Sequence, residues 1–187
     1  EDLSLCEIGP TFIGKNPGEQ QIVVGGWKCG KMNRKRGLDK EREMYVVEIK
    51  SDTMKTLIEL GIEEKNLFVN DNTKNSYHPG RSGSITLKSE KGPHLAYFGE
   101  IHPAIIKNLN CKNKNIFGFE IFLKNIPEPN KKLRLSKKSF QASDYQKSER
   151  DFAFVIDKIF KIGSLEKIIS EVDESLIRNV STFDIYE

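Results

Sequence analysis

The sequence predicts an α+β fold in two units: an antiparallel sheet with flanking helices over residues 1–127, and a smaller strand–helix–strand unit over 140–187. Three observations lead to this expectation. Strand-like segments outnumber helical patterns in the first unit. Residues 128–139, which follow Pro127, combine Pro129 with a run of basic side chains, which opposes regular structure and predicts a linker. The last unit places one helical stripe between two strand-like runs.

Seven segments of the first unit have the composition and length of strands. Each is rich in β-branched, aromatic or other apolar residues and is bounded by turn-forming residues. They are residues 5–12, 21–27, 45–49, 67–69, 84–88, 95–101 and 117–123. The sequence Asn16-Pro17-Gly18 predicts the turn between the first two.

Two short helices are predicted between these strands. Asp52 can cap the first helix, and Gly61 ends it, because glycine tolerates the backbone conformation that follows a helix. The second helix covers residues 103–109 and begins with Pro103, whose missing N–H costs nothing at the first helical position.

The second unit contains two expected strands, Phe152–Ile156 and Val180–Tyr186, on either side of one expected helix that starts at Gly163. Four apolar residues recur on one helical face: Leu165, Ile168, Ile169 and Val172. Strand, helix, strand is the first half of a ferredoxin-like unit, in which a third strand lies between the first two. Without that strand we expect this unit to fray, dock on the first unit, or borrow strands from a second copy.

Charge is concentrated in the linker region. The net charge of the chain is +3, yet residues 128–150 carry seven basic and three acidic side chains. A solvated linker explains this cluster. A contact with a nucleic-acid backbone explains it too, because Lys and Arg displace counterions from phosphates. The candidate residues for that contact are Lys131, Lys132, Arg134, Lys137, Lys138 and Arg150.

The composition excludes several classes of protein. Three widely spaced cysteines with no Cys-x-x-Cys pair argue against a disulfide framework and a zinc knuckle, and we expect no metal site. Apolar runs are far shorter than the roughly 20 residues of a membrane helix. No signal peptide is visible. The chain starts at Glu1 within a few residues of a strand, so we expect a piece of a longer polypeptide.

The first motif is His78-Pro79-Gly80-Arg81-Ser82. Proline and glycine together predict a tight turn into the strand that follows. His78 and Arg81 could bind an anion there. The structural interpretation, which we favour, is that the turn directs Arg81 toward a carboxylate or backbone carbonyls.

The second motif is Gly99-Glu100-Ile101-His102-Pro103. Gly99 permits close approach of a neighbouring backbone. His102 stands where a strand meets a helix, so it could be catalytic, but a role in fixing that corner is the favoured interpretation. No Walker A, G-x-S-x-G or H-E-x-x-H pattern occurs.

Taken together, the motifs resemble a known family. The sequences Leu5-Cys6-Glu7-Ile8-Gly9, His78 to Ser82, Gly99 to Pro103, Phe119-Glu120-Ile121, Arg150 to Val155 and Phe183 to Glu187 follow one another in a fixed order. Their order and spacing resemble the C-terminal part of the bacterial phenylalanyl-tRNA synthetase beta subunit. The resemblance spans nearly the whole chain. It implies a class II synthetase-like sheet without an active site, followed by the start of a ferredoxin-fold anticodon-binding domain.

The resemblance also implies a function. The chain would be a non-catalytic part of a cytoplasmic phenylalanine–tRNA ligase, pairing with the catalytic alpha subunit in a hetero-tetramer and helping to position tRNA. ATP and magnesium would serve the holoenzyme, with no cofactor bound by this chain. The first unit would expose an apolar surface for the alpha subunit. Phe122, Lys124 and Pro127 stand about where the alpha subunit has glycines and an ATP-binding arginine. A generic RNA-binding module is the alternative.

Overall fold

The computed structural model describes residues 2–31, 42–111, 115–128, 145–173 and 175–186. The chain divides into two compact units, residues 1–138 and 139–187. Each unit is described by itself.

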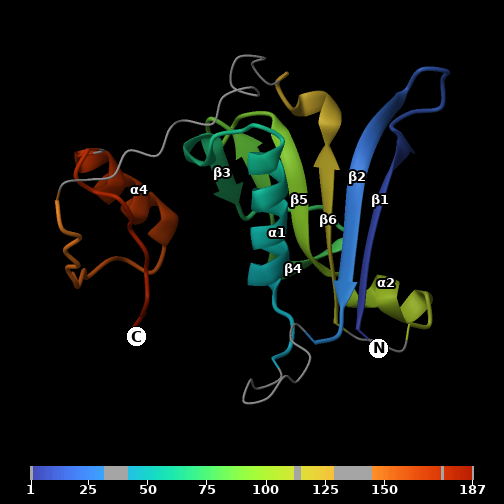
Figure 1. Cartoon of the computed structure of the whole chain (residues 1–187). Coiled ribbons are helices and arrows are strands. Elements are labelled where there is room, and N and C mark those ends of the chain that lie inside the picture. Colours follow the sequence, from blue (N-terminus) through green and yellow to red (C-terminus); the bar gives the residue numbers. More distant parts are fainter. Residues whose placement is uncertain (1, 32–41, 112–114, 129–144, 174, 187) are drawn as a thin grey trace. The chain divides into compact units, whose positions relative to one another are not determined.

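The first unit is built on one six-stranded sheet in the order β1-β2-β6-β5-β4-β3 (Figure 1). Every neighbouring pair of strands is antiparallel. The strands are β1 Leu3–Phe12, β2 Gln20–Cys29, β3 Leu67–Asn70, β4 Tyr77–Leu87, β5 His94–Ile101 and β6 Ile116–Phe122. Helix α1 covers Val46–Glu59, and helix α2 covers Pro103–Asn108. Short 3₁₀ turns stand at Glu64–Asn66 and Leu123–Asn125.

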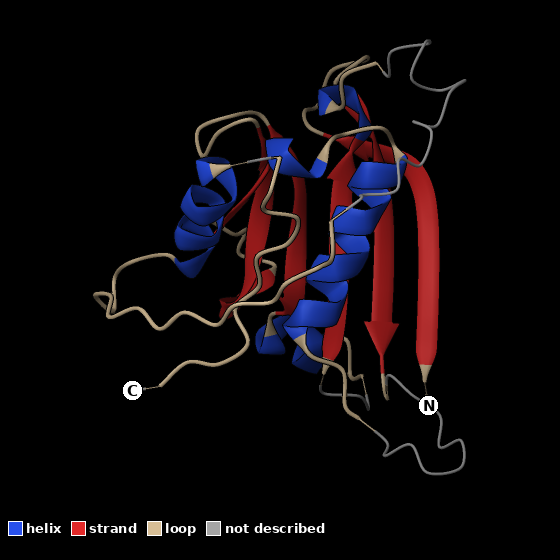
Figure 2. Cartoon of the chain, turned by 60° about the vertical axis from the view of Figure 1, so that its left-hand side comes forward, coloured by secondary structure: helices blue, strands red, loops and turns tan. Residues whose placement is uncertain are grey.

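The main core lies between α1 and the middle of the sheet, along which the helix runs in Figure 2. Ile49 and Leu57 of α1 are fully buried, as is Ile121 of β6. Side chains alternate across a strand, so Phe119 and Ile121 face α1 while Glu120 and Phe122 face away. We call the side of the sheet that carries Glu120 and Phe122 the far face.

Helix α1 starts earlier than expected. Residues 45–49 read as a strand because three of them are β-branched, but helix α1 begins at Val46. Burial of Ile49, Thr53 and Leu57 at helical spacing overrides the local preference. The Tyr45 N–H donates to Glu48 Oε2 at 2.9 Å and so completes the first turn. Asp52, expected as a cap, lies inside the helix and forms an ion pair with Lys28 of β2.

The second unit has one regular element in its described residues, helix α4, which covers Ile162–Val172. The strands expected at Phe152–Ile156 and Val180–Tyr186 are not formed, so these two predictions are wrong for this structure. A strand exists only where a neighbouring strand accepts its backbone hydrogen bonds, and the described residues 145–173 and 175–186 supply none. Instead, the N–H and hydroxyl of Thr182 both donate to Glu166 Oε1, at 2.9 and 2.8 Å.

None of the helices in the described part of the chain is long and apolar enough to cross a membrane.

Candidate functional site

The two sequence motifs meet where β4 runs beside β5. Tyr77 pairs with Ile101, and Ser82 pairs with Gly99, so His78 to Arg81 stand opposite the single residue Glu100. The expected tight turn at residues 78–82 is therefore wrong, because these residues form a bulged part of β4. Proline and glycine are compatible with a bulge as well as with a turn, and the pairing with β5 decides between them.

Gly99 is the residue that lets the bulge approach β5. Its φ is +150°, a conformation that other residues rarely adopt. A Cβ atom on Gly99 would lie 2.2 Å from Ser82 Cβ and 2.8 Å from the carbonyl oxygen of Arg81. The bulge at residues 78–81 and the glycine at 99 are therefore one structural unit.

The bulge places Arg81 against Glu100. Arg81 Nε lies 2.5 Å from Glu100 Oε2, and Nη2 donates to Oε1 at 3.0 Å. The Glu100 side chain is only 7% exposed, whereas that of Arg81 is 54% exposed. The two-point contact neutralises a buried carboxylate and fixes the guanidinium at the surface.

Both histidines of the motifs accept hydrogen bonds from nearby backbone. His78 Nδ1 accepts from the Gly80 N–H at 3.1 Å, and His102 Nδ1 accepts from the Ala104 N–H at 3.2 Å. His102 is thereby the N-cap of α2, and Pro103 follows at the first helical position. The Ser82 hydroxyl donates to the backbone carbonyl oxygen of His78 at 2.5 Å, so it is engaged by backbone and not by an imidazole base. In the described residues, moreover, no three His, Cys, Asp or Glu side chains gather as metal ligands.

A second candidate site is the hairpin of β1 and β2, where apolar side chains are exposed on both faces of the sheet. Ile8 is 66% exposed, Leu5 is 56% exposed, and Trp27 is 40% exposed. We call these residues the hairpin surface: Leu3, Leu5, Ile8, Phe12, Ile13, Ile22 and Trp27. Exposed apolar side chains in such number on one element are typical of a contact surface. The sequence of β1 already indicated this surface. A strand with one face in water carries polar residues at every second position. Apolar residues instead occupy both faces of β1, with Leu3 and Leu5 on one and Ile8 and Phe12 on the other.

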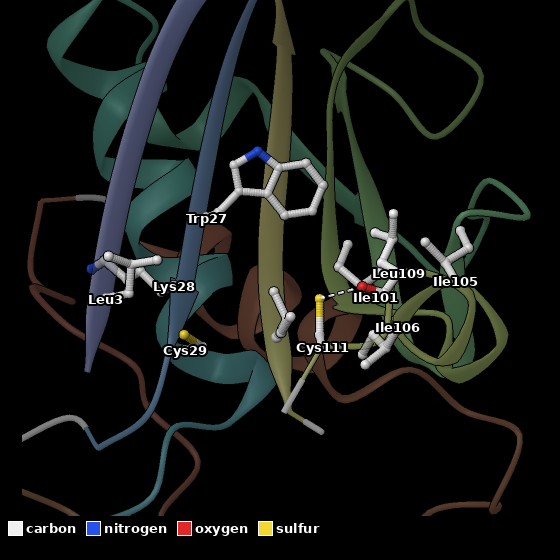
Figure 3. A pocket seen from close by; sticks show the side chains of 10 residues that line it. Leu3, Trp27, Lys28, Cys29, Ile101, Ile105, Ile106, Leu109 and Cys111 are labelled. Atoms are coloured by element: carbon white, nitrogen blue, oxygen red, sulfur yellow. Dashed lines mark hydrogen bonds between the residues drawn. The ribbon is translucent and has the colours of Figure 1, made fainter. Parts of the chain in front are cut away.

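An apolar pocket of about 310 Å³ adjoins the hairpin surface. β1, β2, β5, β6, α2 and the residues after α2 contribute to it (Figure 3). The lining residues are Leu3, Trp27, Lys28, Cys29, Ile101, Ile105, Ile106, Leu109, Cys111 and Ile116. Trp27 lies directly against Gly118, where a Cβ atom would come within 2.9 Å of the indole. The indole therefore lies over β6 on the far face.

The basic residues of the linker region fall into two groups. Lys131, Lys132, Arg134, Lys137 and Lys138 lie outside the described residues. Arg150 is exposed, and its Nη1 donates to the carbonyl oxygen of Glu149 at 3.0 Å. Lys147 Nζ lies 2.7 Å from Glu149 Oε1, so one acidic residue lies between two basic ones.

Comparison with known families places the chain among the components of tRNA synthetases. Residues 1–123 match the family model described as the phenylalanyl tRNA synthetase beta chain CLM domain. Residues 143–187 match the ferredoxin-fold anticodon binding domain. The chain belongs to the phenylalanyl-tRNA synthetase beta chain family, as its motifs had indicated.

Individual relatives agree with this assignment. The chain is 33% identical over 187 residues to the phenylalanine–tRNA ligase beta subunit of Paramagnetospirillum magneticum, covering 100% of the chain and 23% of that protein. It is 35% identical over 191 residues to the same subunit of Bartonella quintana, covering 100% of the chain and 23% of that protein. The chain thus spans about a quarter of the length of the relatives it matches.

Proposed function

We propose that this chain is a non-catalytic part of a phenylalanine–tRNA ligase, which pairs with the catalytic alpha subunit and helps to position tRNA. The hairpin surface carries this proposal, because it is an uncovered apolar surface on a protein whose relatives are beta subunits. The whole enzyme would charge tRNA with phenylalanine in the cytoplasm, as a hetero-tetramer.

The position of the Trp27 side chain disfavours a catalytic role for the far face. The only glycine in β6 is Gly118, and the Trp27 indole lies against it. After β6 the chain enters a 3₁₀ turn at Leu123–Asn125 rather than a glycine-rich turn into a helix. Among the described residues, no group of three or more His, Cys, Asp or Glu side chains is arranged to bind a metal ion. In this proposal ATP and magnesium would be bound elsewhere in the holoenzyme.

The sheet would be a class II synthetase-like domain that has lost its site, over residues 1–127. A linker at 128–139 and the start of an anticodon-binding domain at 140–187 would follow. In this assignment the motif residues have structural roles and touch no substrate. They maintain the bulge of β4, its close contact with β5 and the start of α2: His78, Pro79, Gly80, Arg81, Gly99, His102 and Pro103. The contacts of Arg81 and both histidines with their own chain support that role.

The alpha-subunit contact can be tested with a matched pair of variants. Ile8→Asp puts a charge on the hairpin surface, and Val69→Asp puts one on the opposite edge strand, where Val69 is 38% exposed. We expect Ile8→Asp to weaken co-purification with the alpha subunit at least tenfold and Val69→Asp to leave it unchanged. Equal binding by both variants, at equal melting temperatures, would contradict the proposed surface.

The absence of catalysis has its own test. The chain alone should give no phenylalanine-dependent ATP–pyrophosphate exchange above a blank without protein. Exchange that scales with chain concentration, and survives a second purification step, would overturn the non-catalytic assignment.

Contact with tRNA would come from Lys131, Lys132, Arg134, Lys137, Lys138 and Arg150. For every phosphate that the protein no longer neutralises, the slope of log affinity against log salt should become shallower by about 0.7 to 0.9. Replacing the six by Gln should therefore flatten that slope, whereas replacing Lys55 and Lys91, which lie on exposed parts of the first unit, should not. An unchanged slope in the first variant would remove these residues from the interface.

A further inference from the structure

The far face holds a lysine ammonium group among two aromatic rings and a carboxylate. Lys74 Nζ lies 2.7 Å from Glu120 Oε2. The same nitrogen lies 4.9 Å from the ring centroid of Tyr97 and 4.7 Å from that of Phe122. Rings at this distance attract a cation through their quadrupoles, in addition to the attraction of the carboxylate.

The sheet itself fixes the three groups that surround the ammonium. Glu120 and Phe122 are two residues apart on β6, so they share the far face, and Tyr97 of β5 is the cross-strand partner of Glu120. The Tyr97 and Phe122 rings meet edge to face at a centroid distance of 5.8 Å. His94 stacks on Tyr97 at 5.2 Å. The arrangement therefore does not depend on Lys74 to hold it in place.

Lys74 comes from outside the sheet. It lies in the segment before β4, and the Tyr77 N–H donates to its carbonyl oxygen at 3.0 Å. The side chains of Lys74 and Glu120 are 41% and 31% exposed. Both charged groups of the site are thus partly open to solvent, so an external amine can compete for the carboxylate.

The electrostatic environment favours a cation at this point. The pKa of Tyr97 is raised, first by burial and then by the negative charge on Glu120. The pKa of Tyr77 is raised for the same two reasons, in the same order. Both hydroxyls therefore stay neutral, and Glu120 supplies the negative charge that Lys74 meets.

We propose that Glu120, Tyr97 and Phe122 form a binding site for a primary alkylammonium group, and that Lys74 occupies it as an internal ligand. The lysine holds the segment before β4 on the far face. An external amine competes for the same position. This site is separate from the hairpin surface and does not rest on the assignment to a ligase.

The test replaces Lys74 by alanine and adds, as a free amine, the atoms that the substitution removes. Lys74→Ala deletes a propylammonium group, so we expect n-propylammonium chloride to raise the melting temperature of this variant. At ten times the dissociation constant the rise should be about 3 to 6 °C. Sodium chloride at the same ionic strength and n-propanol should not reproduce the rise. Wild type and Lys91→Ala, which changes an exposed loop lysine, should show less than a third of it.

Second variants separate the site from a general salt effect. Lys74→Ala combined with Glu120→Gln should lose the response, and Lys74→Ala combined with Tyr97→Leu should need at least fivefold more amine. Equal responses in Lys74→Ala, Lys91→Ala and wild type, or none in Lys74→Ala, would overturn the proposal. If Lys74→Ala does not fold in buffer alone, refolding with the amine becomes the readout. Recovery supports the site, and failure overturns it.

Discussion

Replacing Gly99 by alanine tests the close approach of β4 and β5 directly. The added Cβ atom would lie 2.2 Å from Ser82 Cβ and 2.6 Å from Ser82 Cα. Both distances are far below van der Waals contact, and the second is to backbone, which cannot swing aside. The φ of +150° adds a separate cost, because alanine rarely adopts it. The substitution therefore combines a steric clash with backbone strain.

The magnitude follows from these two contributions. Backbone strain at such a φ costs about 1 to 3 kcal/mol, and an atom forced into a packed site costs a further 1 to 3 kcal/mol or so. Gly99→Ala should thus lower the free energy of unfolding by about 2 to 6 kcal/mol. For a chain of this length each kcal/mol lowers the melting temperature by about 2 to 4 °C, so a fall of about 4 to 24 °C is expected.

Two other glycines supply the controls, and urea denaturation with thermal melting gives the readout. Gly18 has a φ of +89° with nothing within 4 Å of its would-be Cβ, so Gly18→Ala carries strain without a clash and should cost about 1 kcal/mol. Gly9 has neither problem, because its nearest contact is at 3.8 Å, and Gly9→Ala should change stability by less than about 0.5 kcal/mol. The reasoning fails if Gly99→Ala is as stable as Gly9→Ala.

Three further predictions concern stability. Deleting residues 140–187 should leave the melting temperature of the first unit within about 2 °C, and a larger fall in calorimetry would show that the units are coupled. Tyr77 is 2% exposed and its pKa is raised by burial, so the stability it contributes is complete below pH 10 or so and is lost above it. Tyr77→Phe should reduce that alkaline loss in urea titrations, and an unchanged pH profile would contradict this. Arg81→Met leaves the Glu100 carboxylate buried without its partner and should cost about 1 to 3 kcal/mol, most of which Arg81→Met with Glu100→Gln should restore. No restoration in the double variant would mean that the arginine acts through other contacts.

Residues that act locally were predictable from the sequence. Gly61 follows the end of α1 with a φ of +97°, and Pro103 opens α2, as their backbone preferences require. Six of the seven strand segments expected in the first unit overlap the observed strands, because each is a short apolar segment between turn residues; the exception is 45–49, and β4 begins at Tyr77 rather than at residue 84. The motifs also identified the family, because their order along the chain is a property of the sequence itself.

Tertiary structure decided whatever depends on a partner distant in sequence. Residues 45–49 favour a strand, yet burial of Ile49 against the sheet places them in α1. The Pro79-Gly80 segment is compatible with a turn or a bulge, and pairing with β5 selects the bulge. Phe152–Ile156 favours a strand but forms none, because a strand's backbone hydrogen bonds must be accepted by another segment. Lys74 and Glu120 are 46 residues apart, so only the fold brings their side chains together. No local sequence pattern predicts the site that they form.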